Sequence, residues 1–322
     1  MEALRVNTEP EESPAAAGDV RERVKALLDG KTVTQADVAK KAGISGSAVS
    51  RWLDHKYEGD NAAVEKSLRI YLASRERQAD FLVPEFPTYV KTRVGERILT
   101  AMTYAHMASD LVLVYGAPGL GKTIALRQYA GRRNNVWVVR ASPSTSNAGG
   151  ILEEIGLALG LKGTDISGRA SRMQRRIIFQ MLGTAGLLVV DEAQHLKLVA
   201  LETLRALHDE AGIGLVLCGN EEVYSRLNGG ARTAVFAQLF SRIGKRVSLT
   251  KAHEEDVEAL AAACKVREPE ALELLKTIAR TPGTYRSVMK TLKLATMLAR
   301  SSGEALNLKH LKLAWHELGS AA

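Results

Sequence analysis

Four short segments of the chain are continuously apolar and rich in β-branched residues. They read LVLVYG from Leu111, VWVVRA from Val136, LLVVDE from Leu187 and GLVLCGN from Gly214. Runs of this length and composition are typical of parallel strands that are buried on both faces. Because helical stretches separate them, the pattern predicts an α/β fold with a doubly wound parallel sheet.

The flanks of this region carry helical patterns instead of strands. Apolar residues recur at helical spacing in the segments before and after the apolar runs, whereas the stretch QADFLVPEFPTY holds two prolines and indicates a linker. The first residues are acidic, polar and proline-bearing, which is typical of a disordered tail. We therefore predict a tail at 1–18, an all-α domain at 19–77, a linker at 78–89, an α/β core at 90–250 and an all-α domain at 251–322.

The chain is basic, with 44 Lys and Arg against 36 Asp and Glu and a formal net charge of +8. This excess favours a polyanionic partner, of which nucleic acid is the first candidate, although a basic protein without such a partner is the alternative. The two cysteines, Cys218 and Cys264, form neither a disulfide framework nor a metal-ligand spacing, which fits a reducing cytoplasm. No apolar run approaches the roughly 18 residues of a membrane span, so we expect no membrane partner.

A glycine-rich loop follows the first apolar segment and fits the pattern GxxxxGK[ST] in full. Its residues are Gly116, Ala117, Pro118, Gly119, Leu120, Gly121, Lys122 and Thr123. The glycines let backbone N–H groups curl around phosphate oxygens at a helix N-terminus. Lys122 would reach the β- and γ-phosphates, and the Thr123 hydroxyl would bind Mg²⁺. With a strand before it and a helix after it, the loop predicts an ATP site rather than a chance turn.

Two acids, Asp191 and Glu192, end the third apolar segment. Ligands of open α/β sheets bind at such carboxyl ends of strands. Asp191 would hold Mg²⁺ through water, and Glu192 is placed to orient and polarise the attacking water. Taken alone, the pair could be an ordinary acidic helix start. The glycine-rich loop upstream favours hydrolysis of ATP with Mg²⁺ instead.

The two motifs together resemble those of the AAA+ ATPases. In that family a strand carries a polar sensor at its end, and Asn220 stands there. An arginine finger is expected before the last strand, where Arg242 is the candidate and Arg246 lies behind it. A second sensor arginine is expected in the helical lid, and Arg286 is the candidate. A routine surface ion pair is the alternative for Arg242 and Arg286. We interpret His195, in the sequence DEAQH, as a structural residue.

The N-terminal segment QADVAKKAGISGSAVSRWLD resembles a repressor-type helix-turn-helix. Ala39 would let the two helices approach, Gly43 would permit the turn, and Thr34 and Ser45 are good N-caps. The second helix would face the major groove of DNA with Ser45, Ser47, Ser50 and Arg51. A helical bundle that makes protein contacts is the alternative.

A second basic surface is predicted in SGRASRMQRR, between the two nucleotide-site motifs. It holds four arginines without an acid between them, Arg169, Arg172, Arg175 and Arg176. At helical spacing Arg169, Arg172 and Arg176 share one face, and Arg175 lies close to it. In a AAA+ ring or spiral this stretch commonly faces the channel. DNA contact is the hypothesis, and a solvated charged face is the alternative. The C-terminal helices are also basic and offer a further surface for DNA or an acidic protein.

The order of these parts resembles the phage Mu transposition protein B family over roughly residues 20–320. The resemblance implies an ATP-dependent, largely nonspecific DNA-binding ATPase, in the cytoplasm of a bacterium or a phage-infected host. Such a protein would oligomerise on double-stranded DNA as a filament or ring, select target DNA and activate a transposase. Two other classes stay open at this point: an ATP-dependent transcription regulator, and a replication or helicase-loading ATPase of the AAA+ type.

Overall fold

The chain divides into two compact units, Met1–Pro84 and Glu85–Ala322. A computed structural model describes residues 19–30, 33–81, 86–161, 169–229 and 241–319. The predicted tail, 1–18, lies outside the described residues. Within the described ranges, no helix has the length and apolar character needed to cross a membrane.

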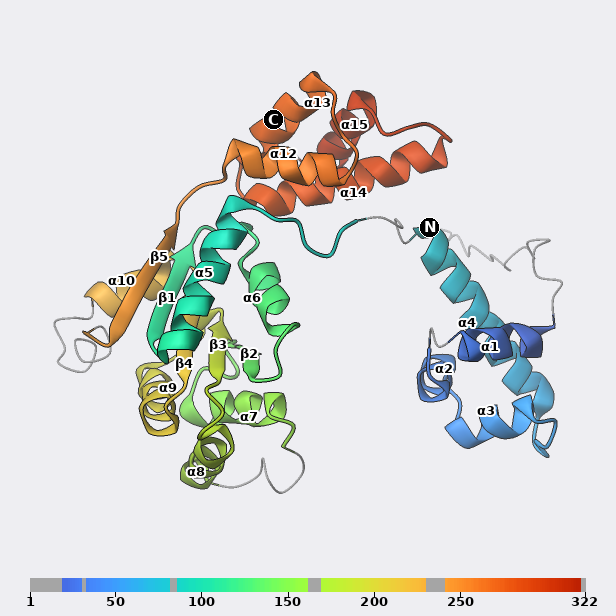
Figure 1. Cartoon of the computed structure of the whole chain (residues 1–322). Helices are drawn as coiled ribbons and strands as arrows, with labels where there is room; N and C mark the ends of the chain where they lie inside the picture. Colours follow the sequence, from blue (N-terminus) through green and yellow to red (C-terminus); the bar gives the residue numbers. More distant parts are fainter. Residues whose placement is uncertain (1–18, 31–32, 82–85, 162–168, 230–240, 320–322) are drawn as a thin grey trace, which may run out of the picture. The chain divides into compact units, whose positions relative to one another are not determined.

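The N-terminal unit consists of four helices around a small apolar core. The helices are α1 (Val20–Asp29), α2 (Gln35–Ala42), α3 (Gly46–Leu53) and α4 (Asn61–Phe81) (Figure 1). Their buried side chains include Val24, Val38, Val49, Trp52 and Leu68. The α4 helix continues to Phe81, so the first residues of the predicted linker are helical. Its sequence holds good helix formers and meets no glycine or proline before Pro84.

The turn between α2 and α3 forms as its sequence predicts. Thr34 caps α2 in a capping box with Asp37, and the Ser45 hydroxyl accepts a hydrogen bond from the Ala48 amide at the start of α3. Gly43 ends α2 with φ of +71°, a left-handed conformation that favours glycine. Val38 and Ala39 are buried between the helices. This unit is therefore a helix-turn-helix fold with two further helices.

The larger unit is built on a five-stranded parallel sheet in the order β2-β3-β4-β1-β5. The strands are β1 (Leu111–Gly116), β2 (Val136–Arg140), β3 (Leu187–Asp191), β4 (Gly214–Gly219) and β5 (Ile243–Leu249). All four apolar segments are strands, and the predicted α/β class is confirmed. Because the strands are parallel, β1, β3 and β4 present the glycine-rich loop, the two acids and Asn220 at the same carboxyl edge.

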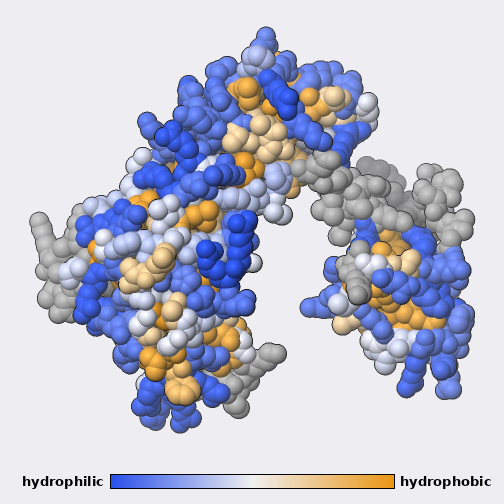
Figure 2. All heavy atoms as spheres, in the orientation of Figure 1, coloured by the Kyte–Doolittle hydropathy of each residue, from blue (hydrophilic) through white to orange (hydrophobic). Residues whose placement is uncertain are grey.

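Helices cover both faces of the sheet, because alternate strand residues point to opposite sides. One face packs against α5 (Arg93–Ala108) and α6 (Lys122–Ala130). The other face packs against α7 (Ala148–Ala158), α8 (Ala170–Met181), α9 (Leu198–Ala211) and part of α10 (Glu221–Gly229). Figure 2 shows hydrophobic residues gathered around the α7–α8 end of this unit, whose exposed apolar side chains include Leu157, Phe179 and Leu182.

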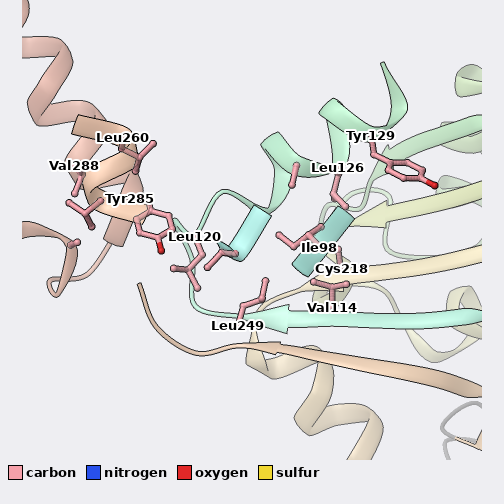
Figure 3. Packing of buried hydrophobic residues seen from close by; sticks show 14 of the residues in the cluster. Ile98, Val114, Leu120, Leu126, Tyr129, Cys218, Leu249, Leu260, Tyr285 and Val288 are labelled. Atoms are coloured by element: carbon pink, nitrogen blue, oxygen red, sulfur yellow. The ribbon is translucent and has the colours of Figure 1, made fainter. Parts of the chain in front are cut away.

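Four helices follow the sheet and form a lid: α12 (Glu254–Ala263), α13 (Pro269–Ala279), α14 (Thr284–Ser301) and α15 (Leu308–Glu317). The lid shares one continuous apolar core with the α5–α6 face of the sheet. Figure 3 shows Leu120 of the glycine-rich loop between Tyr285 of the lid and side chains of the sheet. The nucleotide loop therefore sits where the two parts of this unit meet.

A buried carboxylate fastens the lid to the first helix of this unit. Asp256 is 1% exposed, and its two oxygens accept hydrogen bonds from the amides of Arg93 and Val94 at 2.5 and 3.2 Å. The Tyr285 hydroxyl donates to the same carboxylate at 2.8 Å and accepts from the His253 amide. An acid at a helix N-terminus is favourable, since it meets unpaired amides and the positive end of the dipole.

Candidate nucleotide site and DNA-binding surfaces

The glycine-rich loop adopts a conformation that suits phosphate binding. Gly116, Gly119 and Gly121 all have positive φ, which side chains rarely tolerate. A Cβ at Gly121 would meet no described atom within 4 Å, so the space beside the start of α6 is open. Amides of the first turn of α6 face this space, because a helix N-terminus leaves its first amides without helical partners.

Lys122 begins α6 and folds back over the loop. Its Nζ donates hydrogen bonds to the carbonyls of Gly116 and Ala117, each at 2.8 Å. Burial lowers the pKa of the Lys122 ammonium from its ordinary value, while Asp191 and Glu192 oppose this shift. The ammonium is thus partly desolvated and held by neutral carbonyls, which an anionic phosphate could replace with a stronger partner.

Thr123 and Asp191 form the pair expected to hold a magnesium ion. The Thr123 hydroxyl lies 2.6 Å from Asp191 Oδ2, although the two residues come from α6 and β3. Asp191 is 3% exposed, and its Oδ1 also accepts the Glu192 amide at 3.0 Å. Hydroxyl and carboxylate oxygens are the hard ligands that Mg²⁺ prefers, so the donor set fits the ion. When bound, it would neutralise charge between the β- and γ-phosphates.

Glu192 is held in an unusual backbone conformation at the end of β3. Its φ of +56° is left-handed, which turns the chain sharply after the strand. One carboxylate oxygen accepts a hydrogen bond from Gln194 Nε2 at 2.6 Å, and the other lies 3.5 Å from an Arg140 guanidinium nitrogen. Each oxygen of the Glu192 carboxylate therefore has a neighbouring donor group.

Asn220 directly follows β4, beside β3 and its acids. Its amide donates to Gln194 Oε1 at 3.3 Å, and its own side chain accepts the Glu222 amide at the start of α10. The predicted sensor and the predicted base therefore meet through Gln194. His195 is exposed in a short 3-10 helix, Ala193–His195, so it is Gln194 that takes a buried place after the acids.

The lid touches the nucleotide loop through backbone contacts. The Arg286 amide donates to the Gly119 carbonyl at 3.2 Å, and the Thr284 hydroxyl donates to the Pro118 carbonyl at 3.1 Å. The Arg286 charge also acts on Lys122, whose pKa it helps to lower. The Arg286 side chain is exposed at the start of α14. The structure thus brings the predicted second sensor beside the loop.

Arg242 lies away from the other predicted catalytic residues of its own chain. It precedes β5, and Ile243 of β5 pairs with Leu111 at the start of β1, whereas the glycine-rich loop follows the end of β1. Arg242 is exposed and forms an ion pair with Asp209 of α9 at 3.3 Å. Parallel pairing therefore places Arg242 at the amino edge of the sheet, at the opposite end of the strands from its own glycine-rich loop.

The predicted DNA-reading residues lie on one helix of the N-terminal unit. Ser45, Ser47 and Arg51 are exposed, whereas Ser50 is half-buried. The Ser45 hydroxyl already caps α3 and lies 3.1 Å from the Ser47 hydroxyl. Arg51 therefore has the most freedom to reach DNA, and the two serines are partly committed to the helix start.

The four arginines near α8 are all exposed. Arg169 is the residue before the helix, and Arg172, Arg175 and Arg176 project from it, opposite the buried Met173 and Ile177. Two cations of the basic C-terminal helices are paired with acids. Lys276 pairs with Glu254, Glu258 and Glu273, and Arg280 pairs with Glu254. Glu254 and Glu258 belong to α12 and come close to Lys276 and Arg280 only when α12 packs beside α13, whereas Glu273 is a neighbour of Lys276 within α13.

Family models match two parts of the chain. Residues 106–227 match an AAA domain, and residues 241–318 match the model described as Mu B transposition protein, C terminal. With the parallel sheet, the glycine-rich loop and the lid, these matches define an AAA+ ATPase that works with ATP. The ATPase prediction is confirmed.

Curated relatives give the family. The ATP-dependent target DNA activator B of Escherichia phage Mu is 38% identical over 300 residues, covering 93% of this chain and 95% of that protein. The Mu-like prophage FluMu DNA transposition protein B of Haemophilus influenzae is 40% identical over 271 residues, covering 84% of this chain and 93% of that protein. The chain belongs to the Mu B transposition protein family, as the sequence indicated.

Solved structures share the fold at low identity. The ORC2 protein of Aeropyrum pernix superposes with a TM-score of 0.58 at 19% identity, covering 76% of this chain and 72% of that one. Cdc6p of Pyrobaculum aerophilum superposes with a TM-score of 0.56 at 17% identity, covering 74% of this chain and 70% of that one. These similarities concern the arrangement of sheet and lid.

Proposed function

We propose that this protein is an ATP-dependent DNA-binding ATPase that assembles on double-stranded DNA, selects a target and activates a transposase. The observation that carries this proposal is a sequence identity of 38%, over 93% of the chain, to a protein named ATP-dependent target DNA activator B. The net charge of +8 and the exposed arginines of α8 support a polyanionic partner.

The chemistry follows from the residues at the carboxyl edge of the sheet. The loop from Gly116 to Thr123 binds the phosphates, and Lys122 leaves its carbonyl partners for them. Thr123 and Asp191 would hold Mg²⁺, which would lower the effective charge of the phosphates when bound. Glu192 accepts a proton from the attacking water, and Asn220 contacts the reacting group. The proximity of Thr123 to Asp191, with Glu192 next in the chain, supports these roles.

ATP controls the assembly in this proposal. Arg242 of one subunit approaches the γ-phosphate bound by its neighbour, so ATP joins subunits and hydrolysis separates them. Each subunit contributes a few phosphate contacts from α8 and from α3, and a row of subunits binds DNA far more tightly than one does. The exposure of Arg242 at the opposite edge from its own loop supports a contact between subunits.

Electron microscopy and DNA binding test the proposal together. The full chain is incubated with long double-stranded DNA and either ATPγS or ADP, in the presence of Mg²⁺. Ordered oligomers on DNA with ATPγS, absent with ADP, are the expected result, and affinity should rise with DNA length. A protein that stays monomeric on DNA with ATPγS contradicts the proposal. A single protected sequence would favour a transcription regulator instead.

Deletion of 1–60 tests the helix-turn-helix separately. It should weaken DNA binding while leaving basal ATP hydrolysis, because the larger unit has its own core. Arg51→Ala in the full chain is the finer variant, and Arg69→Ala, on the exposed side of α4, is its matched control. If deletion and Arg51→Ala both leave DNA affinity unchanged at several salt concentrations, this unit serves protein contacts.

A further inference from the structure

Gln194 is a buried polar residue at the nucleotide site that the motifs do not assign. It lies in the 3-10 helix Ala193–His195, two positions after Glu192, and only 8% of it is exposed. Buried polar groups need hydrogen-bond partners, and an amide offers both donors and an acceptor. The partners of Gln194 therefore indicate what its place in the site does.

The two ends of the Gln194 amide bind different parts of the site. Nε2 donates to Glu192 Oε2 at 2.6 Å, a short bond to a carboxylate, and Oε1 accepts the Asn220 amide at 3.3 Å. Gly219 leaves the room for this arrangement. A Cβ at Gly219 would lie only 2.5 Å from Gln194 Oε1. A side chain at this position would therefore push the amide away from Asn220.

The second contact of Glu192 is weaker. Arg140 lies 3.5 Å from the other carboxylate oxygen, and its side chain is 69% exposed. An exposed ion pair at this distance contributes little to holding a side chain in place. The sharp left-handed turn at Glu192 fixes its backbone but leaves its side-chain torsions free. Among the contacts described for Glu192, the bond from Gln194 therefore determines most of the carboxylate's orientation.

We propose that Gln194 is a positioning residue that joins the hydrolytic carboxylate of Glu192 to the sensor Asn220. This inference rests on the proposed function of Glu192 and Asn220. The planar amide couples the positions of its two partners. When the end of β4 moves, Oε1 follows the backbone N–H of Asn220, and Nε2 then shifts the Glu192 carboxylate. A side-chain amide supplies a donor toward the acid and an acceptor toward the backbone N–H at once. Gln194 does not itself take a proton from water.

Two substitutions separate the functions of the two ends. Gln194→Glu keeps an acceptor for Asn220 but replaces the donor by a second carboxylate beside Glu192. The two carboxylates repel each other, so Glu192 should leave its position, and kcat should fall while KM for ATP changes little. Gln194→Met has similar length and no strong hydrogen-bonding group, so it should also lower kcat while KM for ATP changes little.

The magnitude follows from the loss of one hydrogen bond to a charged group. We expect kcat for ATP hydrolysis to fall about 10–100-fold in both variants. The Kd of a fluorescent ATP analogue should change less than about threefold, since the two hydrogen bonds described for Gln194 run to Glu192 and Asn220. His195→Ala, the exposed neighbour, is the control and should keep both values.

The experiment measures kcat and KM for ATP of the full chain with DNA and Mg²⁺, alongside thermal unfolding and analogue binding. A kcat within twofold of wild type in both Gln194 variants overturns the inference, as does a fall in kcat that comes with an equal loss of analogue binding. If Gln194→Glu does not fold, Gln194→Met alone decides. A normal kcat in Gln194→Met rejects the positioning role of Gln194, and a lowered kcat at unchanged KM supports it.

Glu192→Gln, run in parallel, separates this inference from the function on which it rests. Wild-type turnover by Glu192→Gln would mean that the base is misassigned, so the proposed chemistry fails. Loss of turnover in Glu192→Gln with normal Gln194 variants would reject the positioning role alone.

Discussion

The Thr123 hydroxyl and Asp191 Oδ2 lie 2.6 Å apart, although 68 residues separate them in the chain. The contact joins the first turn of α6 to the end of β3. It sets two oxygen ligands side by side at the edge where ligands of parallel sheets bind. Asp191 is nearly fully buried, so its orientation is fixed by the fold before any ion arrives.

Thr123→Val should therefore raise the Mg²⁺ concentration needed for half-maximal ATP hydrolysis. Valine keeps the shape but lacks the hydroxyl, and loss of a hydrogen bond to a charged group costs about 1.5–3 kcal/mol, or roughly tenfold or more in affinity. Thr123→Ser keeps the oxygen and is the matched control. Mg²⁺ titration of hydrolysis measures both. Equal half-maximal concentrations in the valine and serine variants would contradict the ligand assignment.

Lys122→Ala and Glu192→Gln should separate binding from chemistry. Removing Lys122 deprives the phosphates of their main cation, and a lost buried charge partner costs about 2–5 kcal/mol of binding. Glu192→Gln should bind ATP normally and turn it over at least about 100-fold more slowly, since the amide cannot accept the proton. Binding of a fluorescent analogue and steady-state hydrolysis distinguish the two. Normal hydrolysis by either variant would remove that residue from the mechanism.

Gly119→Ala should loosen the lid. Gly119 has φ of +89°, and a Cβ there would collide with the backbone carbonyl of Gly283 in the lid. Gly121 is the matched control, because its φ of +82° brings similar backbone strain but no described atom lies within 4 Å of its Cβ. Strain alone costs about 1–2 kcal/mol. Thermal unfolding should show a larger loss of stability for Gly119→Ala than for Gly121→Ala, and equal losses would refute the lid contact.

The central strands can be predicted from the sequence because their burial on both faces is visible in consecutive apolar residues. The strands β1, β3 and β4 have neighbours on both sides and helices on both faces, so their residues are apolar without interruption. The edge strand β5 instead alternates, with Ile243, Val247 and Leu249 buried and polar residues between them. The order of the strands depends on pairings between distant segments, which no local pattern encodes.

The same distinction explains which site residues were found. The glycine-rich loop and the two acids carry their chemistry in consecutive residues, so spacing identifies them. Gln194 and Asp256 have no such pattern. Gln194 gains its partners because β3 and β4 are neighbours, and Asp256 because the lid folds back onto α5. The short sequence DEAQH, which contains both residues, was the only local indication of Gln194. We interpreted its histidine, His195, and gave Gln194 no role.

Arg172→Ala should weaken binding to all DNA sequences alike. It should also flatten the slope of log K against log salt by about one unit. Each phosphate contact displaces about one counterion from DNA on binding, so a protein with one contact fewer displaces one counterion fewer. The double variant with Arg176→Ala should flatten the slope by about two units. Arg127→Ala, an exposed arginine of α6, removes the same charge elsewhere and is the control. An unchanged slope in the double variant would make α8 a solvated face.

Arg242 offers the strictest test of assembly. It stands before Ile243, which pairs with Leu111, so it lies a full strand away from its own glycine-rich loop. Six residues of β1 span roughly 17–20 Å, more than an arginine can reach. Arg242→Ala should therefore keep ATP binding and lose both assembly and DNA-stimulated hydrolysis. Asp209→Asn, which weakens the ion pairs of Asp209 with Arg242 and Arg205 but keeps the Arg242 side chain, should keep both assembly and hydrolysis.

Mixing Arg242→Ala with Lys122→Ala decides whether the arginine acts between subunits. Each variant should be inactive alone, since one lacks the finger and the other lacks the phosphate-binding lysine. In a mixed oligomer, an intact loop from one chain can meet an intact Arg242 from its neighbour, so a fraction of the hydrolysis should return. That fraction should depend on the mixing ratio and be greatest when both variants are present in comparable amounts. If mixtures shown to co-assemble on DNA recover no activity at any ratio, Arg242 does not complete a neighbouring site, and Arg246 becomes the next residue to test.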